Sequence, residues 1–95
     1  MFENARYITK GVNADIPLWL RNLMWYAIDI MKTERKDYLQ VFKLTAVNGS
    51  QKIVHIQEQP PYSHEYLLAV DIPITKKVFV IDDGDHSTML LADEY

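Results

Sequence analysis

The chain has 95 residues, enough for one hydrophobic core but too few for two that could fold without cross-links. With 48% hydrophobic residues it should be globular, and the absence of cysteine excludes disulfides and thiolate-bound metals. A net charge of −3 argues against non-specific nucleic-acid binding, and no apolar run is long enough to cross a membrane. We therefore expect one domain over residues 1–95, in a protein of the cytoplasm.

The first third of the chain predicts a strand followed by a helix. Residues 6–12 alternate loosely between β-forming and polar side chains, which favours a strand whose end is weakened by a glycine. Asn13 or Asp15 then offers an N-cap, and Pro17 suits the first helical turn, where its missing N–H costs nothing. Nothing interrupts the helix until about Lys32, so we expect one long helix.

Helical periodicity separates an apolar side of this helix from a polar one. At about 100° per residue, a broad apolar arc that should face the sheet collects Ile16, Trp19, Leu20, Leu23, Met24, Tyr26, Ala27, Ile30 and Met31. Leu18 and Trp25 fall inside the opposite polar arc, which also carries Arg21. These three are the candidate partner-binding residues, because tryptophan and arginine are common interface anchors. Alternatively, another segment covers Leu18 and Trp25, or each is an isolated exposed apolar residue.

Two β-rich segments, 38–47 and 50–58, flank Asn48-Gly49. Asn-Gly between such segments is a strong hairpin signal, because both turn residues need positive φ. A two-residue loop fixes the register and pairs Val47 with Ser50, Leu44 with Ile53, Phe42 with His55, Val41 with Ile56, Lys43 with Val54, and Thr45 with Lys52. The face with Phe42 and His55 is the more apolar, so we assign it to the helix. His55 is then better explained as a neutral core imidazole than as a ligand.

The remaining strands complete the predicted fold. Two prolines at 60 and 61 end the hairpin, and residues 66–72, 78–81 and 86–91 predict further strands, the last two antiparallel. Residues 86–91 could instead begin a C-terminal helix capped by Asp85. The expected class is α+β, with one long N-terminal helix packed on a mostly antiparallel sheet of five or six strands in the order β-α-β-β-β-β-β.

The acidic turn at Asp82–His86 is the candidate for chemistry. A two-residue loop would place Asp82 directly opposite Asp85, and like charges there are destabilising. A divalent cation could bridge the pair, or a longer turn could let Asp82, Asp83 and Asp85 cap backbone N–H groups. In the strict register His86 points to the other face, so the three groups do not converge. We therefore favour a solvated turn over a metal or catalytic site.

Two other polar features have weak functional interpretations. His64 follows Ser63, but neighbours in sequence do not make a nucleophile–base pair, which needs spatial convergence and an orienting group. The basic loop at Lys32–Lys36, with Tyr38 just beyond, resembles a weak nucleic-acid patch. Glu34 and Asp37 offset its few cations, so a solvated loop is favoured.

Several blocks together resemble a known family: residues 1–12 (MFENARYITKGV), 38–42 (YLQVF), 51–58 (QKIVHIQE) and 80–95 (VIDDGDHSTMLLADEY). They are similar to a small Firmicutes family described as staphylococcal proteins of unknown function, from low-GC Gram-positive bacteria and their mobile elements. The resemblance covers nearly the whole chain and implies a bacterial cytoplasmic protein. It implies no activity, cofactor or site residue.

The residues therefore favour a small non-catalytic protein-interaction module, acting with an unknown partner or as a homodimer through the face around Leu18, Arg21 and Trp25. We expect no cofactor and no membrane association. The first alternative is a metal-dependent or acid–base enzyme at the Asp82–His86 turn, with Asp82 and Asp85 as the metal candidates. The second is a weak nucleic-acid binder that uses the Lys32–Lys36 loop.

Overall fold

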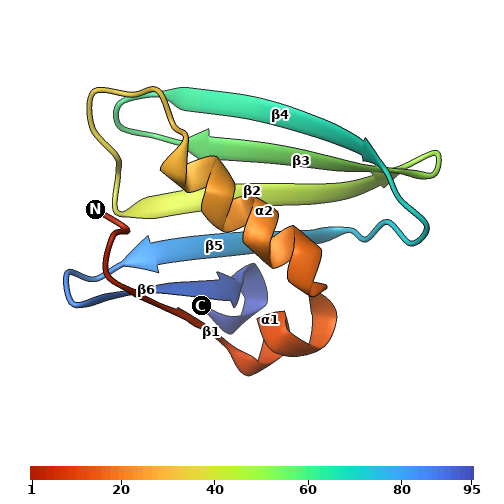
Figure 1. The fold of residues 1–95 in the computed structure, drawn as a ribbon, viewed down its shortest axis with the longest axis horizontal. Helices are drawn as coiled ribbons and strands as arrows, with labels where there is room; N and C mark the ends of the chain where they lie inside the picture. Colours follow the sequence, from red (N-terminus) through yellow and green to blue (C-terminus); the bar gives the residue numbers. More distant parts are fainter.

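The computed structural model describes residues 1–95 and contains six strands and two α-helices (Figure 1). In chain order the elements are β1 (Ala5–Ile8), α1 (Lys10–Asp15), α2 (Leu18–Asp29), β2 (Leu39–Val47), β3 (Ser50–Gln57), β4 (Tyr62–Ala69), β5 (Lys76–Asp82), β6 (His86–Leu91) and the short 3-10 helix η1 (Ala92–Glu94). The α+β class is confirmed. No helix has both the length and the apolar character that crossing a membrane requires.

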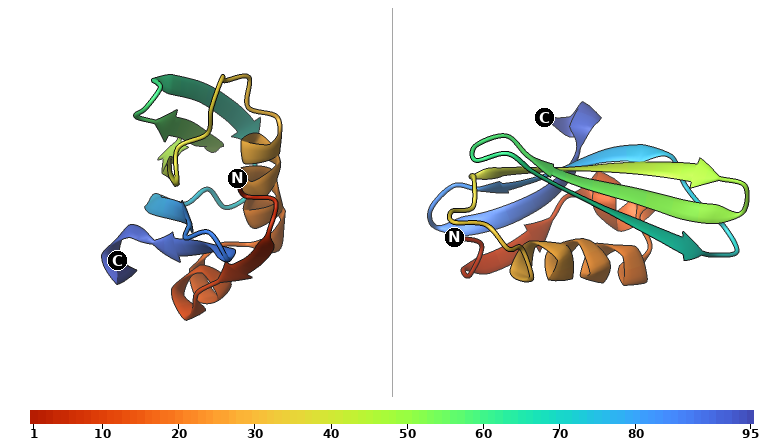
Figure 2. Two further views of the ribbon diagram at one scale, coloured as in Figure 1. Left: turned by 90° about the vertical axis from the view of Figure 1, so that its left-hand side faces the viewer. Right: turned by 90° about the horizontal axis from the view of Figure 1, so that it is seen from above.

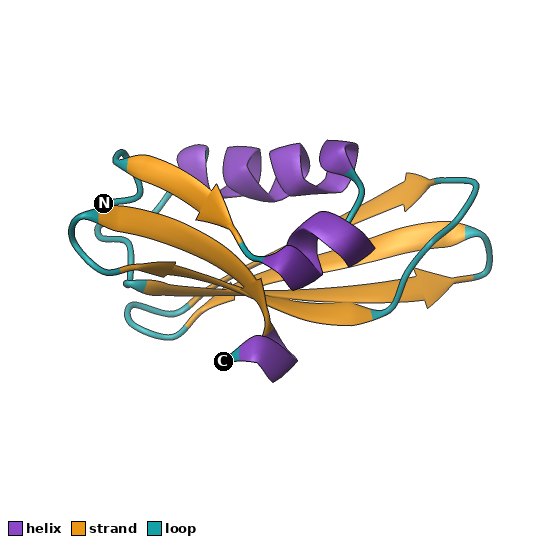
Figure 3. Ribbon diagram, turned by 90° about the horizontal axis from the view of Figure 1, so that it is seen from below, coloured by secondary structure: helices purple, strands orange, loops and turns teal.

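All six strands form one sheet in the spatial order β1-β6-β5-β2-β3-β4. Every pair is antiparallel except β1 with β6, which run parallel at one edge. Figure 2 shows the sheet curving around α2, which covers one face. Figure 3 shows η1 projecting from the opposite face. The sheet therefore has a helix-covered face, an open face, and two edges formed by β1 and β4.

The predicted single helix is wrong, and so is the end of the predicted first strand. β1 stops at Ile8, and Thr9 caps α1 by accepting a hydrogen bond from the Val12 N–H at 3.3 Å. The Glu94 carboxylate, from the other end of the chain, accepts from the Gly11 N–H at 3.1 Å and the Thr9 hydroxyl at 2.6 Å. Extended backbone then separates α1 from α2. A contact more than 80 residues away in sequence thus selects the helix over the strand.

The absence of a side chain at Gly11 lets the Glu94 carboxylate approach this position closely. A Cβ at position 11 would lie 2.7 Å from the Glu94 carboxyl carbon, closer than carbon atoms approach without bonding. Hydrogen bonds from the Thr9 hydroxyl and the Leu91 N–H, stronger than the opposing effect of burial, lower the pKa of Glu94. The junction between β1 and α1 is therefore closed by a charged cap from the C-terminal turn.

The predicted hairpin is confirmed in turn and register. Asn48 and Gly49 have φ of 45° and 79°, as a two-residue turn that continues the strand twist requires. All six predicted pairs between β2 and β3 are present, and Val47 lies opposite Ser50. Phe42 and His55 face α2 and are fully buried, as expected. The local turn chemistry was therefore sufficient to orient both strands.

The core lies between α2 and the covered face. Its cluster of 15 buried residues joins the N-terminal segment, both helices and the sheet: Phe2, Val12, Ile16, Leu20, Met24, Ala27, Ile28, Met31, Phe42, Leu44, Ile53, Val78, Val80, Met89 and Leu91. Burying aliphatic and aromatic side chains of this size contributes about 1.5–3 kcal/mol each before conformational entropy is counted. Phe2 belongs to this core although it precedes the first strand.

Buried glutamines on the covered face hold the loops next to the sheet. Gln57 accepts from the Asp37 N–H at 2.7 Å and donates to the Arg35 and Pro60 carbonyls. Gln51 accepts from the Ile74 N–H at 2.8 Å and donates to the Ile74 carbonyl at 2.9 Å, as a neighbouring strand would. Because each buried amide is paired, burial of these polar groups is compatible with a stable core.

Candidate functional site

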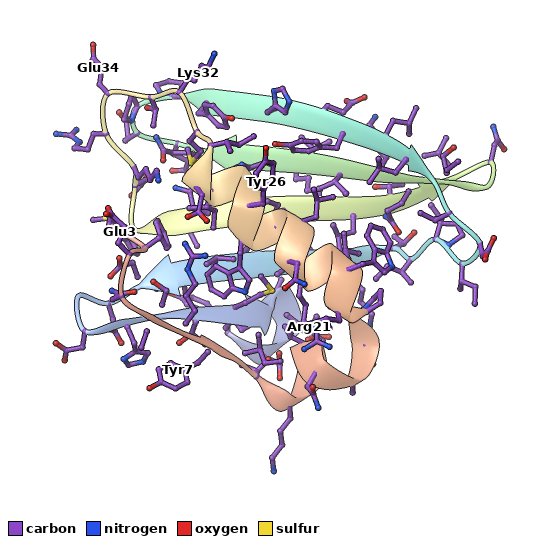
Figure 4. All side chains as sticks on the ribbon, viewed as in Figure 1. Glu3, Tyr7, Arg21, Tyr26, Lys32 and Glu34 are labelled. Carbon is purple, nitrogen blue, oxygen red and sulfur yellow. The ribbon has the colours of Figure 1, made fainter.

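The exposed apolar residues of α2 include Leu18, as predicted, but otherwise differ from the prediction. Leu20, Met24, Ala27 and Ile28 are buried, so the buried side of the helix is turned away from the centre of the predicted arc. Three members of that arc are instead exposed: Trp19 by 42%, Tyr26 by 55% and Ile30 by 42%. We call these three residues the α2 apolar stripe. Figure 4 shows Tyr26 projecting from α2 toward the β3–β4 side of the sheet, so the stripe flanks that side.

The predicted partner-binding residues do not form one exposed face. Leu18 is 61% exposed, but Trp25 is half-buried and packs against the core. The Arg6 guanidinium lies 4.8 Å from the centre of the Trp25 ring and also pairs with Asp29. One alternative considered from the sequence was that another segment covers this face. This is the case for Trp25, which Arg6 of β1 covers. Leu18 remains available to a partner.

Arg21, the third predicted residue, lines a pocket between the α1–α2 junction and the segment 70–74. The pocket has a volume of about 520 Å³ and is lined by Asn13, Ala14, Asp15, Ile16, Pro17, Trp19, Arg21, Val70, Asp71, Ile72 and Ile74. The Arg21 Nε donates to the Ile16 carbonyl at 3.0 Å, which fixes the side chain and leaves its other nitrogens unpaired. Ile72 is 80% exposed at the rim. The pocket therefore combines apolar walls with the Arg21 guanidinium, whose terminal nitrogens have no hydrogen-bond partner.

The far edge of the sheet is a second exposed feature that the sequence did not reveal. β4 covers residues 62–69 rather than the predicted 66–72, and every residue in it is exposed or half-buried. Tyr66 Oη is buried without a hydrogen-bond partner. Burial raises the pKa of Tyr66, and the neighbouring Tyr62 and Tyr26 add to this effect. The α2 apolar stripe and β4 therefore meet at a tyrosine cluster.

The acidic turn is the wider of the two turns considered. Asp82 pairs with Ser87 rather than with Asp85, so the predicted opposition of two carboxylates does not occur. The Asp82 carboxylate accepts from the Phe2 N–H at 2.6 Å, the Gly84 N–H at 2.7 Å and the Asn4 amide at 3.2 Å. Burial opposes its ionisation, but these bonds outweigh burial and lower the pKa of Asp82. Asp82 thus anchors the N-terminal segment.

The other acidic side chain of this turn with a defined role is Asp83. Its carboxylate accepts from the Asp85 and His86 N–H groups at 3.2 and 3.1 Å and lies 3.2 Å from the His86 ring. The Asp85 side chain is exposed and makes no hydrogen bond. No group of three histidine, aspartate or glutamate side chains is placed to hold a metal ion. Asp82 and Asp83 therefore satisfy backbone donors, as carboxylates in turns do.

His55 is held as a neutral imidazole inside the core. Its ring stacks on Phe42 with centroids 4.3 Å apart, and Nε2 lies 2.6 Å from the Gln40 side-chain oxygen. That oxygen is an acceptor, so Nε2 carries the proton and Nδ1 is buried without a partner. Burial lowers the pKa of His55 to about 4, and the nearby His64 and Lys36 add to the effect. A histidine of this kind stabilises the core only while it is neutral.

The basic loop follows α2 and is held by the buried glutamines. The Gln57 amide donates to the Arg35 carbonyl at 3.0 Å, while the Lys32 and Arg35 side chains are exposed. Figure 4 shows Lys32 and Glu34 both pointing outward from this loop, at separate places along it. His64 stacks edge-on against Tyr66, with ring centroids 4.7 Å apart, and no nucleophile–base pair forms there.

Comparison with known proteins covers almost the whole chain. The family model described as "Staphylococcal protein of unknown function (DUF960)" matches residues 5–94. The fold is similar to one titled "Crystal structure of the protein of unknown function from Enterococcus faecalis", with a TM-score of 0.77 and 26% identity over 97% of this chain and 91% of that one. No curated protein matches the chain. The family match includes both edge strands, β1 and β4, and neither description names an activity.

Proposed function

The chain belongs to the family of staphylococcal proteins of unknown function, and we propose that it acts as a small, non-catalytic protein-interaction module in the cytoplasm of a Gram-positive bacterium. One observation supports this most strongly. An open pocket of about 520 Å³ lies beside exposed apolar side chains and contains an arginine whose terminal nitrogens are unpaired. A pocket of this volume is large enough to receive a side chain or a short segment of a partner.

The lining of the pocket indicates the chemistry of the partner. Trp19, Ile72 and Ile74 offer apolar surface, which suits an aliphatic or aromatic side chain. The Arg21 guanidinium can receive a carboxylate in a bidentate geometry, because only its Nε is committed. Asp15 already pairs with Lys76 at 3.4 Å, so its charge is partly compensated. We therefore propose a protein segment with an apolar residue next to an acidic one.

This role retains two of the residues indicated by the sequence and replaces the third. Arg21 lines the pocket, and the exposed Leu18 lies in the chain between two lining residues, Pro17 and Trp19. Trp19 takes the place of Trp25, whose ring is covered by Arg6. Both tryptophans belong to one helix, and a rotation about its axis decides which of them a partner can reach.

The test compares Trp19→Ala with Asn22→Ala in affinity capture from lysate of a Gram-positive bacterium. Asn22 is an exposed residue of the same helix that lies outside the pocket, so it controls for surface change. We expect the captured proteins to be retained by Asn22→Ala, and lost by Trp19→Ala and by Arg21→Ala. Identical captured sets for all variants, with unchanged melting temperatures, would contradict the proposal.

A further inference from the structure

The β4 strand presents a row of free backbone groups along the edge of the sheet. The two-residue turn makes Val47 and Ser50 a hydrogen-bonded pair, and such pairs alternate along an antiparallel ladder. The N–H and C=O groups of Ile53 and His55 therefore point to β4, where their partners are Tyr66 and His64. By the same alternation, Ser63, Glu65, Leu67 and Ala69 direct their backbone groups away from the sheet.

An independent contact confirms this assignment. Val70, which follows β4 directly, donates its N–H to the Gly49 carbonyl at 3.4 Å, toward β3. Even-numbered residues of this strand thus face inward, and odd-numbered residues face outward. Figure 1 shows β4 as the outermost strand, with no segment along its free side. Four residues therefore have backbone donors and acceptors without partners in the protein.

β4 also lacks the features that usually block an exposed edge. Natural edge strands are short, contain lysine or proline, or are bent by a bulge. β4 has eight residues, pairs with β3 at every position, and contains no lysine and no proline. Its one charged side chain is Glu65. An edge of this length and regularity is a template for another strand.

We propose that this edge pairs with β4 of a second copy of the same chain, antiparallel across a two-fold axis at Tyr66. In an antiparallel pair, outward-facing residues must lie opposite outward-facing residues. The four outward residues are centred on position 66, so this register uses all of them, pairing Ser63 with Ala69 and Glu65 with Leu67. It gives about eight backbone hydrogen bonds, two for each hydrogen-bonded pair.

Charge distinguishes this register from its neighbours. Moving the axis to Glu65 would place two glutamates directly opposite each other, which is destabilising. Moving it to Leu67 would leave Ser63 outside the paired strands. With the axis at Tyr66, Glu65 lies opposite an apolar residue on the open face, and the two tyrosines are adjacent on the helix-covered face. The strand is thus complementary to itself in one register.

The α2 apolar stripe supports a copy of the same chain as the partner. Tyr26 projects from α2 toward the side of the sheet where β4 lies (Figure 4). In a two-fold dimer with a continuous sheet, both helices lie on the same face, so the two stripes face each other across the new seam. The same arrangement places apolar surface beside Tyr66 of both copies. One interface therefore accounts for the free edge and for the exposed stripe that flanks it.

The first test uses a proline on the free side of β4. Leu67→Pro removes an outward N–H without removing a bond to β3, because proline is tolerated where the N–H faces solvent. Leu67→Ala keeps that N–H and is the matched control. We expect sedimentation from about 1 µM to 1 mM to show a monomer–dimer equilibrium for the parent and Leu67→Ala, and monomer alone for Leu67→Pro. A monomeric parent, or a dimeric Leu67→Pro that melts like the parent, would overturn the proposal.

The second test remains informative if Leu67→Pro does not fold. The chain contains no cysteine, so introduced cysteines report on their own positions. The proposed register places His64 opposite Leu68 of the other copy, in a non-hydrogen-bonded pair close enough for a disulfide. Mild oxidation should link His64→Cys/Leu68→Cys into dimers and leave each single variant unlinked. Equal linking of the single and double variants would overturn the register.

This dimer is independent of the partner proposed for the pocket. Arg21→Ala changes the pocket without altering the backbone groups of β4 or the α2 apolar stripe, to which Trp19 belongs. Loss of capture with Arg21→Ala, together with a dimer that persists, would support both proposals. A dimer that disappears only with Leu67→Pro would assign self-association to the edge.

Discussion

The two edges of this sheet are built differently: the β1 edge is short and anchored by side-chain contacts, whereas the β4 edge is long and regular. β1 has only four residues and leads directly into α1, whereas β4 has eight. Several side-chain contacts fix the β1 edge: Asp82 to Phe2 and Asn4, Ser87 to Asn4, Arg6 to Asp29, and Glu94 to Thr9 and Gly11. The free side of β4 has no comparable set. We call the β1 edge the anchored edge and the β4 edge the free edge. The free edge offers twice as many residues to a partner strand as the anchored edge.

The largest expected effect concerns the anchored edge at β1. Phe2 is fully buried in the core, so Phe2→Ala should destabilise the protein by about 3–5 kcal/mol through lost burial and a residual cavity. Urea unfolding followed by circular dichroism measures this loss. Glu3→Ala is the control, because Glu3 is exposed and should change stability by less than about 0.5 kcal/mol. Equal stabilities for the two variants would show that Phe2 does not anchor the N-terminal segment to the core.

Acid should weaken the β4 side of the sheet before the β1 side. His55 lies opposite His64 of β4, and its pKa is lowered to about 4 from an ordinary 6.5. The folded state therefore binds the proton less well than the unfolded state, and stability falls as the pH falls from about 6.5 to 4, by up to about 3 kcal/mol. Urea unfolding between pH 7.5 and 4.5 measures this slope. His55→Gln should reduce this slope, and an unchanged slope in His55→Gln would contradict the assignment to His55.

The contribution of Asp82 to the stability of the anchored edge should be lost in a lower pH window. The pKa of Asp82 is lowered, so its stabilising bonds persist above about pH 4 and are lost only as the pH falls further. Asp82→Asn should cost about 2 kcal/mol at pH 7, because bonds to a charged acceptor are replaced by weaker ones. Amide exchange should then quicken at Phe2 and Gly84. Asp85→Asn is the matched control and should leave both amides unchanged.

The sequence predicted those parts of the fold that depend on local chemistry. Asn48-Gly49 determines a turn with positive φ, and the turn determines every pair between β2 and β3. The alternation of side chains then places Phe42 and His55 in the core. The backbone groups alternate in the same way, so the pairing of β3 with β4 identifies the β4 residues whose N–H and C=O groups point away from the sheet.

The missed features depend on partners distant in sequence. Residues 10–12 have strand-like composition, but the Glu94 carboxylate and the Thr9 cap stabilise a helix there. Arg6 of β1 covers Trp25, and α2 packs through Leu20, Met24, Ala27 and Ile28, so the α2 apolar stripe is exposed. The Asp82 carboxylate binds the Phe2 N–H, 80 residues away in sequence. Helical periodicity contains none of these contacts, so the predicted site combined one covered residue with two available ones.

The central claim is that the outward backbone groups of β4 are free in one copy and paired between two. Residue-resolved amide hydrogen exchange at several protein concentrations tests it most directly. We predict that the amides of His64, Tyr66 and Leu68 are protected at every concentration. Those of Glu65, Leu67 and Ala69 should exchange quickly at low concentration and become protected as concentration rises. Protection of both sets that does not change with concentration would contradict the account.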